Sequence, residues 1–296
     1  MLKSFKIKSG LTEKQIESDV ATYLSWISPS GGLPYRLLDI DEQLTGADKK
    51  LNLVIPVYMQ FKVAHGLMPL TSSVFLPSFG NPLQEIRRYR KDKDLADAPT
   101  LYFKLRDKAK TAEDLQHNIL LKLRSISRVE AFYVAPLMLD KDEYYNELCA
   151  PSVRPMYDPF FHSRIAIHDA SWVSYIGMVP FLRAHVSIPP MDRVEDSNHY
   201  YSFSTTGDDI AFHSPNDLFG VHRLSDELKR ILGTSLNNPY AWLDVEECMI
   251  ELNRAFSLTD EVVSNRLPLE RLQEFGRRLY ETYDIRQFLF LSNKEL

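Results

Sequence analysis

The stretch VYMQFKV at residues 57–63 alternates large apolar side chains with more polar ones, among them Gln60 and Lys62. A strict period of two is typical of a β-strand that buries one face. Gln60 and Lys62 therefore project together from the other face. This segment therefore predicts a central strand of the fold. It also carries Gln60 and Lys62, the pair of polar residues that says most about function.

An acidic residue precedes this strand at a short distance. Asp48 lies twelve residues before Gln60 and two residues after the turn residue Gly46, at the start of an expected strand over 51–54. If that strand and the strand carrying Gln60 form a hairpin, then Asp48, Gln60 and Lys62 meet at one end of the sheet.

Such a set of side chains has a clear chemical use. A carboxylate such as Asp48 is a hard oxygen ligand for Mg²⁺, which proteins usually hold with one or two carboxylates plus a substrate phosphate. The Gln60 amide oxygen is a weaker ligand. Lys62 can position or deprotonate an attacking water, or stabilise developing negative charge. A carboxylate from the first helix, Glu17 or Glu13, can complete the site.

Elements around the motif alternate between helix and strand. The pair Thr12 and Gln15 indicates a capped helix start, and apolar residues at helical spacing continue to residue 27. Up to residue 139 the predicted order is helix, three strands, an insertion over 66–100, strand, helix and strand. The insertion carries four prolines and a short helix near 83–91. The predicted elements are a helix over 12–27, strands over 35–40, 51–54, 57–63, 101–105 and 130–138, and a helix that begins at Thr111 or Asp114 and continues through Leu123.

At Gly46-Ala47-Asp48 and Gln60-Phe61-Lys62 the sequence resembles the PD-(D/E)xK nuclease superfamily, whose motif is an Asp, a gap, then an acidic residue or Gln, one apolar residue and Lys. The Gln variant is similar to that of Mrr-like restriction endonucleases. The resemblance covers about 130 residues and implies a restriction-endonuclease-like fold, with an αβββαβ core and a mixed α/β sheet.

The resemblance also implies a function. It implies a Mg²⁺- or Mn²⁺-dependent nuclease that hydrolyses DNA phosphodiester bonds, in prokaryotic restriction or antiviral defence. Asp48, Gln60 and Glu17 then hold the metal, and Lys62 completes the catalytic set. Helix residues Glu17 and Glu13 lie on nearly the same flank, so both remain candidates for the helix carboxylate.

Further basic residues are candidate contacts to DNA phosphates, because each neutralised phosphate releases counterions and strengthens binding. One group lies in the basic run at 87–93, and a second lies on the strand and helix that follow, where Gln116-His117 opens the helix. A charge run is also typical of a solvated helix face, and a lone helix His is more often structural. The candidate DNA-binding residues are Arg87, Arg88, Arg90, Lys91, Lys104, Arg106 and His117.

The second half of the chain gives weaker signals. Short strand-like pieces occur at 184–188, 200–204 and 210–213, and amphipathic helices are predicted over 225–232, 242–255 and 267–282. We therefore expect a nuclease-like domain over 1–145 and a mixed, mainly helical region over 146–296 for recognition or partner binding. An oligomer is compatible with this arrangement.

Composition excludes several classes of protein. The chain has 296 residues, 44% hydrophobic and 25% charged, with a net charge of −5, which indicates a globular protein without a uniformly basic surface. Positive charge for DNA must then be local. Cys149 and Cys248 form no metal or disulfide pattern. No stretch is apolar enough for a membrane span or a signal peptide, so we expect a cytoplasmic protein.

A second hypothesis uses the same residues differently. The negative net charge, the Gln in place of an acid at position 60 and the helical second half also fit a catalytically inactive nuclease fold. Such a protein would serve as a binding or scaffold subunit of a larger complex. Metal binding discriminates between the two hypotheses.

Overall fold

The structure is a computed structural model of the chain. It describes residues 5–27, 35–39, 53–70, 80–95, 99–150, 179–213, 216–220, 222–256 and 267–292. Within these ranges the chain forms two β-sheets and eight α-helices, so the predicted mixed α/β class is confirmed. Among the same residues, no helix is both long enough and apolar enough to cross a membrane.

The larger sheet is mixed and has the strand order β11-β7-β6-β3-β13-β2, with β12 paired to β3 outside this path. β3 and β6 run parallel, and the other strand pairs of this sheet are antiparallel. Its strands are β2 (Tyr35–Asp39), β3 (Leu53–Phe61), β6 (Glu130–Pro136), β7 (His185–Ile188), β11 (His222–Arg223), β12 (Leu243–Asp244) and β13 (Arg286–Ser292).

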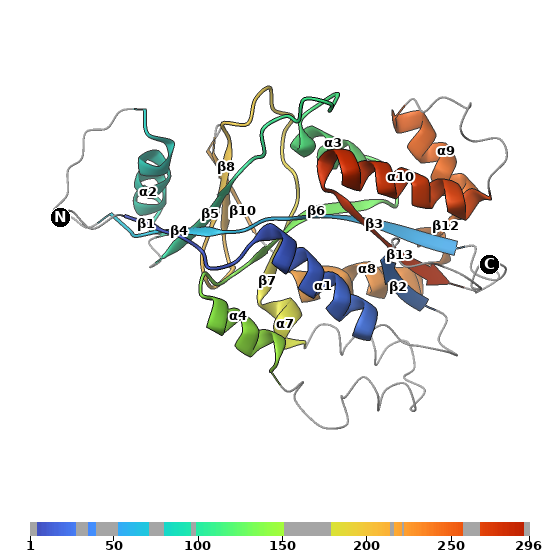
Figure 1. Ribbon diagram of the computed structural model, residues 1–296, viewed down its shortest axis with the longest axis horizontal. Coiled ribbons are helices and arrows are strands. Elements are labelled where there is room, and N and C mark those ends of the chain that lie inside the picture. Colours follow the sequence, from blue (N-terminus) through green and yellow to red (C-terminus); the bar gives the residue numbers. More distant parts are fainter. Residues whose placement is uncertain are drawn as a thin grey trace.

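The smaller sheet is antiparallel throughout, in the order β1-β4-β5-β8-β9-β10. It is joined to the larger sheet where the chain passes from β3 into β4 (Figure 1). Its strands are β1 (Lys6–Ile7), β4 (His65–Leu67), β5 (Thr100–Lys104), β8 (Tyr200–Phe203), β9 (Ile210–His213) and β10 (Asp217–Phe219).

Helices cover both faces of the larger sheet. In Figure 1, α3, α9 and α10 lie on one side of it and α1, α4, α7 and α8 on the other, while α2 stands against the smaller sheet. The helices are α1 (Glu13–Ile27), α2 (Pro82–Asp92), α3 (Gln116–Arg124), α4 (Lys141–Leu148), α7 (Pro180–Arg183), α8 (Leu224–Asn237), α9 (Val245–Phe256) and α10 (Pro268–Tyr283), with a 3-10 turn η2 (Pro239–Ala241).

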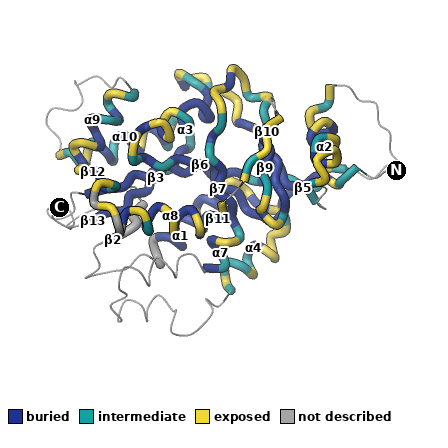
Figure 2. Tube along the Cα trace, turned by 180° about the vertical axis from the view of Figure 1, so that it is seen from behind, coloured by how far each residue is buried: buried dark blue, intermediate teal, exposed yellow. Residues whose placement is uncertain are grey.

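Strand β3 separates two hydrophobic cores. Val54 and Tyr58 pack in the core beneath α3, α9 and α10, whereas Val57 and Met59 pack in the core beneath α1 and α8. All nine residues of β3 are buried, and Figure 2 shows the strands buried between more exposed helices. The period of two was therefore correct, but the expectation of one solvent-facing side was wrong, because helices cover both faces.

The expected hairpin before Gln60 is wrong. The predicted strands at 51–54 and 57–63 fall in one strand, β3, whose neighbours are β13 and β6. Pro56 lies inside β3, opposite Leu289. Proline lacks the backbone N–H that a sheet interior normally uses, but β3 continues through this residue.

The expected boundary near residue 145 does not separate two units. Both sheets contain strands from each side of it: β6 pairs with β7, and β5 pairs with β8. The last strand, β13, was not predicted, and it lies between β2 and β3 in the larger sheet. The first and second halves of the chain therefore build one pair of sheets together. The restriction-endonuclease-like core remains a prediction.

Two arginines of the basic run are structural. Arg87 is buried, and it donates from Nε to the Met68 carbonyl (2.6 Å) and from Nη2 to the Pro69 carbonyl (3.0 Å). Its Nη1 donates to Gln84 Oε1 (2.7 Å). The expectation that Arg87 contacts DNA was therefore wrong, because its donors hold the chain that follows β4.

Arg90 is buried more deeply, with 1% of its surface exposed. Its Nη2 lies 2.7 Å from Asp209 Oδ1, and its Nε donates to the Leu95 carbonyl (3.2 Å). A buried guanidinium needs such partners, because removing its hydration costs several kcal/mol. The expected DNA contact at Arg90 was also wrong. Arg88 and Lys91, by contrast, are exposed on α2 and remain candidates.

Arg90→Ala should lower the free energy of unfolding by about 3 kcal/mol, because Asp209 loses its counter-charge in a mostly buried site. Arg88→Ala, on the exposed side of the same helix, should change it by less than about 0.5 kcal/mol. Urea denaturation followed by far-UV circular dichroism measures both. Similar losses in the two variants would contradict the structural role of Arg90.

Candidate active site around Lys62

Lys62 lies directly after β3, and 3% of its side chain is exposed. Its backbone N–H donates to the Val134 carbonyl of β6 (2.9 Å), which extends the parallel pairing by one residue. Its ammonium donates to Gln116 Oε1 (2.9 Å) and lies 3.7 Å from Glu13 Oε1. A buried cation is thus held between an amide and a carboxylate from two different helices.

The starts of these two helices position the partners of Lys62. Thr12 Oγ1 accepts from the Gln15 N–H (3.2 Å), as the capping pattern predicts, and Glu13 opens α1. Gln116 opens α3, and its Nε2 donates to the Tyr283 carbonyl at the end of α10. The Gln116 amide therefore connects Lys62 to the C-terminal part of the chain.

Burial has the largest effect on the pKa of Lys62. Loss of water around the ammonium lowers the pKa of Lys62 from its ordinary value. The Glu13 carboxylate acts in the opposite direction, and Arg106 lowers the pKa further. A lysine with a lowered pKa exchanges protons more readily near neutral pH than an exposed lysine does, which suits proton transfer.

Gln60 precedes Lys62 by two residues on the same face of the chain and is 2% exposed. Its Nε2 donates to the Phe61 carbonyl (3.0 Å), while its Oε1 is buried and has no hydrogen-bond partner among the described residues. An unsatisfied buried acceptor costs about 1 to 3 kcal/mol. A water molecule or a metal ion bound to Oε1 would remove this cost.

The oxygen atoms of Gln60 and Glu13 are of the type that binds a hard divalent cation. The Gln60 amide oxygen and the Glu13 carboxylate are ligands of the type that Mg²⁺ takes. The third predicted ligand, Asp48, lies outside the described residues. Within those residues, no three His, Cys, Asp or Glu side chains gather as a metal site, so a metal here would also need Asp48 and water.

Glu17 does not contact Lys62. Its carboxylate accepts from Arg286 Nη1 of β13 at 2.5 Å, and the Arg286 guanidinium stacks over the Tyr280 ring, which Lys14 also approaches. The structure therefore pairs Glu17 with an arginine and does not bring it to Lys62. Glu13, the alternative left open by the sequence, is the carboxylate beside Lys62.

His117 is 2% exposed, and both of its ring nitrogens have partners. Nδ1 lies 2.8 Å from the Tyr133 hydroxyl and Nε2 lies 3.1 Å from the Asp192 carbonyl. Burial lowers the pKa of His117 to about 4. The expected DNA contact at His117 was wrong. Its neighbour Gln116 is the site residue that the sequence analysis missed, although the pair opens the predicted helix.

Lys104 and Arg106 project from the end of β5 and just beyond it. Lys104 Nζ lies 3.5 Å from Asp107 Oδ1, and Arg106 forms an ion pair with Asp284. About 40% of each basic side chain is exposed (38% and 42%). Both therefore remain candidates for DNA contact, but a phosphate would have to compete with the paired carboxylates.

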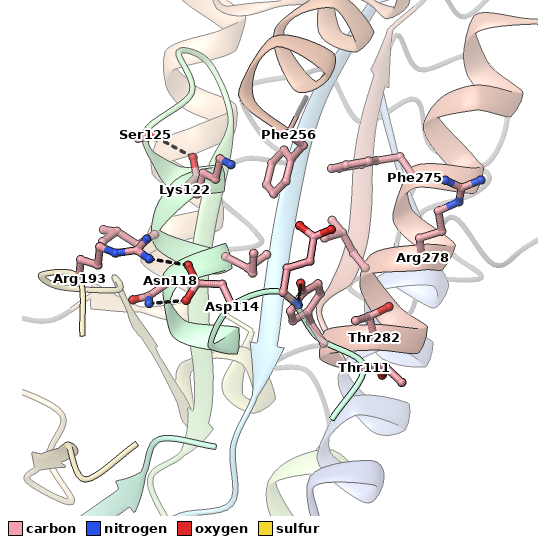
Figure 3. A pocket seen from close by; sticks show the side chains of 15 residues that line it. Thr111, Asp114, Asn118, Lys122, Ser125, Arg193, Phe256, Phe275, Arg278 and Thr282 are labelled. Carbon is pink, nitrogen blue, oxygen red and sulfur yellow. Dashed lines mark hydrogen bonds and ion pairs between the residues drawn. The ribbon is translucent and has the colours of Figure 1, made fainter. Parts of the chain in front are cut away.

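A groove of about 770 Å³ lies between α3 and α10, with Phe256 of α9 at one end (Figure 3). Asp114 on its α3 side is paired with Arg193 (2.8 Å) and bound by Asn118 (2.8 Å). Tyr283 lines the groove and also supplies the carbonyl that holds Gln116. The groove is therefore directly beside the Lys62 site.

Comparisons of the chain with protein-family models, with curated proteins and with solved structures find no match.

A double-mutant cycle tests the Lys62–Gln116 contact. Gln116→Leu should lower the free energy of unfolding by about 1 to 3 kcal/mol, because the buried ammonium loses its acceptor. In the Lys62→Met background the same change should cost much less, giving a coupling energy of about 1 kcal/mol or more. Urea unfolding of the four proteins measures it. Strictly additive losses would contradict the contact.

Proposed function

We propose that the protein is a metal-dependent nuclease that hydrolyses DNA phosphodiester bonds at Lys62. The observation that carries this proposal is the buried Lys62 ammonium, 2.9 Å from Gln116 Oε1 and 3.7 Å from Glu13 Oε1. It supports the proposal because a buried lysine beside a carboxylate is costly for stability and useful for charge stabilisation.

Each side chain has a role in the proposed reaction. A divalent cation held by Asp48, Gln60 and Glu13 would polarise the phosphoryl oxygen and lower the pKa of a bound water. Lys62 orients the attacking water or takes its proton, and in its charged form it stabilises the negative charge that develops on the phosphate. Gln116 holds the Lys62 ammonium in place for either role.

Support for the choice of DNA comes from the sequence resemblance and from exposed cations near the site. A role in restriction of foreign DNA is part of the proposal and rests on the resemblance alone. Binding of a protein partner through residues 146–296 stays a prediction.

The activity test uses plasmid DNA with Mg²⁺ or Mn²⁺, compared with EDTA. Wild-type protein should nick or degrade the DNA only with the metal. Lys62→Met should lower the rate by about 10²- to 10⁴-fold, the range for loss of a group that transfers a proton. Asp48→Asn should also lower the rate, because it removes a proposed metal ligand. The matched control is Lys229→Met, an exposed lysine on α8, which should cleave at the wild-type rate. Unchanged cleavage in Lys62→Met would refute the assignment of the site.

The same assay separates the two carboxylates of α1. Glu13→Gln should lower the cleavage rate, whereas Glu17→Gln should leave the rate of the folded protein unchanged and lower its stability by loss of the Arg286 pair. No cleavage and no metal dependence in folded wild-type protein would favour the scaffold hypothesis.

A further inference from the structure

Lys8 directly follows β1, and His65 is the first residue of β4, in the smaller sheet near the Lys62 site. β1 pairs with β4 so that Ile7 lies opposite Gly66. The next position along this antiparallel pair brings Lys8 next to His65, and cross-strand neighbours share one face of a sheet. β4 begins three residues after Lys62, where the two sheets join (Figure 1).

Electrostatic contacts connect this pair to the site. Burial lowers the pKa of His65, Lys8 lowers it further, and Glu13 acts in the opposite direction. Glu13 is the same carboxylate that lies 3.7 Å from the Lys62 ammonium. His65 begins β4 three residues after Lys62, and the β1–β4 register brings Lys8 beside it, so both residues lie near the place where the proposed reaction would occur.

The backbone that carries Lys8 is firmly anchored. The residue after it, Ser9, donates from its hydroxyl to the Leu139 carbonyl (3.3 Å) and accepts from the Leu11 N–H (3.1 Å). Gly10 N–H donates to the same Leu139 carbonyl (2.9 Å). These bonds tie the segment to the connection between β6 and α4, so its backbone is positioned before any ligand binds.

The structure assigns the tautomer of His65. The Ser9 N–H lies 3.3 Å from His65 Nδ1, and an amide N–H can only donate, so Nδ1 is the acceptor. The proton of the neutral ring is then on Nε2. Among the described residues Nε2 has no hydrogen-bond partner, and the side chain is only partly buried. Nε2 is therefore a fixed donor available to a ligand.

We propose that Lys8 and His65 bind a phosphate of the DNA strand adjacent to the phosphodiester held at Lys62. Lys8 supplies a charge, since it is exposed and has no ion-pair partner among the described residues. His65 supplies an oriented N–H, and anionic oxygens accept such bonds strongly. The inference rests on the proposed function, because the site at Lys62 determines which phosphate is adjacent.

The test measures binding without cleavage. A short fluorescein-labelled oligodeoxynucleotide is titrated with protein in EDTA at several salt concentrations, and fluorescence anisotropy gives the affinity. Lys8→Ala should weaken binding about 3- to 10-fold and reduce the slope of log affinity against log salt by about 0.7 to 0.9, the contribution of one neutralised phosphate.

His65→Phe should weaken binding by a similar factor without changing that slope, because a neutral donor releases no counterion. The phenyl ring keeps the packing against Tyr102, whose ring centre lies 5.9 Å from that of His65. His65→Gln, which restores a side-chain N–H, should recover most of the affinity. Lys229→Ala should bind as the wild type does.

The outcomes separate this inference from the proposed function. Wild-type affinity in both Lys8→Ala and His65→Phe, or no binding by the wild type, would overturn the inference. If the wild type cleaves DNA but both variants bind normally, only the inference fails. If the variants lose affinity as expected but no metal supports cleavage, the phosphate site stands and the nuclease proposal fails.

Discussion

The burial of one positive charge determines how this site is built. Lys62 sits where the two sheets join, almost without contact to solvent. Removing an ammonium from water costs several kcal/mol unless a counter-charge and hydrogen-bond acceptors replace its hydration. Glu13 and Gln116 do so, and each stands at the first position of a helix. The paths of α1 and α3 over the sheet are thereby tied to this lysine.

The C-terminal part of the chain contributes to the same arrangement. Gln116 is held by the Tyr283 carbonyl, and Arg106, which acts on Lys62, is paired with Asp284. Two residues later β13 begins and inserts between β2 and β3. The position of Lys62 thus depends on a contact between Gln116 and Tyr283, which are more than 150 positions apart in the sequence. A substitution in α10 or β13 should therefore shift the position of the Lys62 side chain, although neither element carries a predicted site residue.

Local patterns in the sequence predict well where helices and strands lie, but they predict poorly which strands pair with one another. Period-two alternation locates β3, and capping residues locate the start of α1, because these signals depend on residues a few positions apart. The position of β13 depends on pairing with β3 and β2, about 230 and 250 residues earlier in the chain, and no local pattern encodes that. The continuation of β3 through Pro56 likewise depends on the strands that pair with β3.

The site residues show the same contrast. Gln60 and Lys62 share one strand, so their spacing alone places them together. Glu13 and Glu17 lie on one helix flank, and only the presence of Arg286 beside Glu17 decides between them. Arg87, Arg90 and His117 are types that usually face solvent, but each is buried here with partners that are distant in sequence. The residue types predicted that these side chains are exposed, but tertiary contacts bury them.

We propose that oxygen donors of Asp48, Gln60 and Glu13 hold a divalent cation. Calorimetric titration of metal-free protein with Mn²⁺ tests it most directly. We expect one bound Mn²⁺ per chain, with binding lost in Asp48→Asn and weakened in Gln60→Leu, because each variant removes one of the proposed ligands. Absence of Mn²⁺ binding by folded wild-type protein, or equal binding by all three proteins, would contradict it.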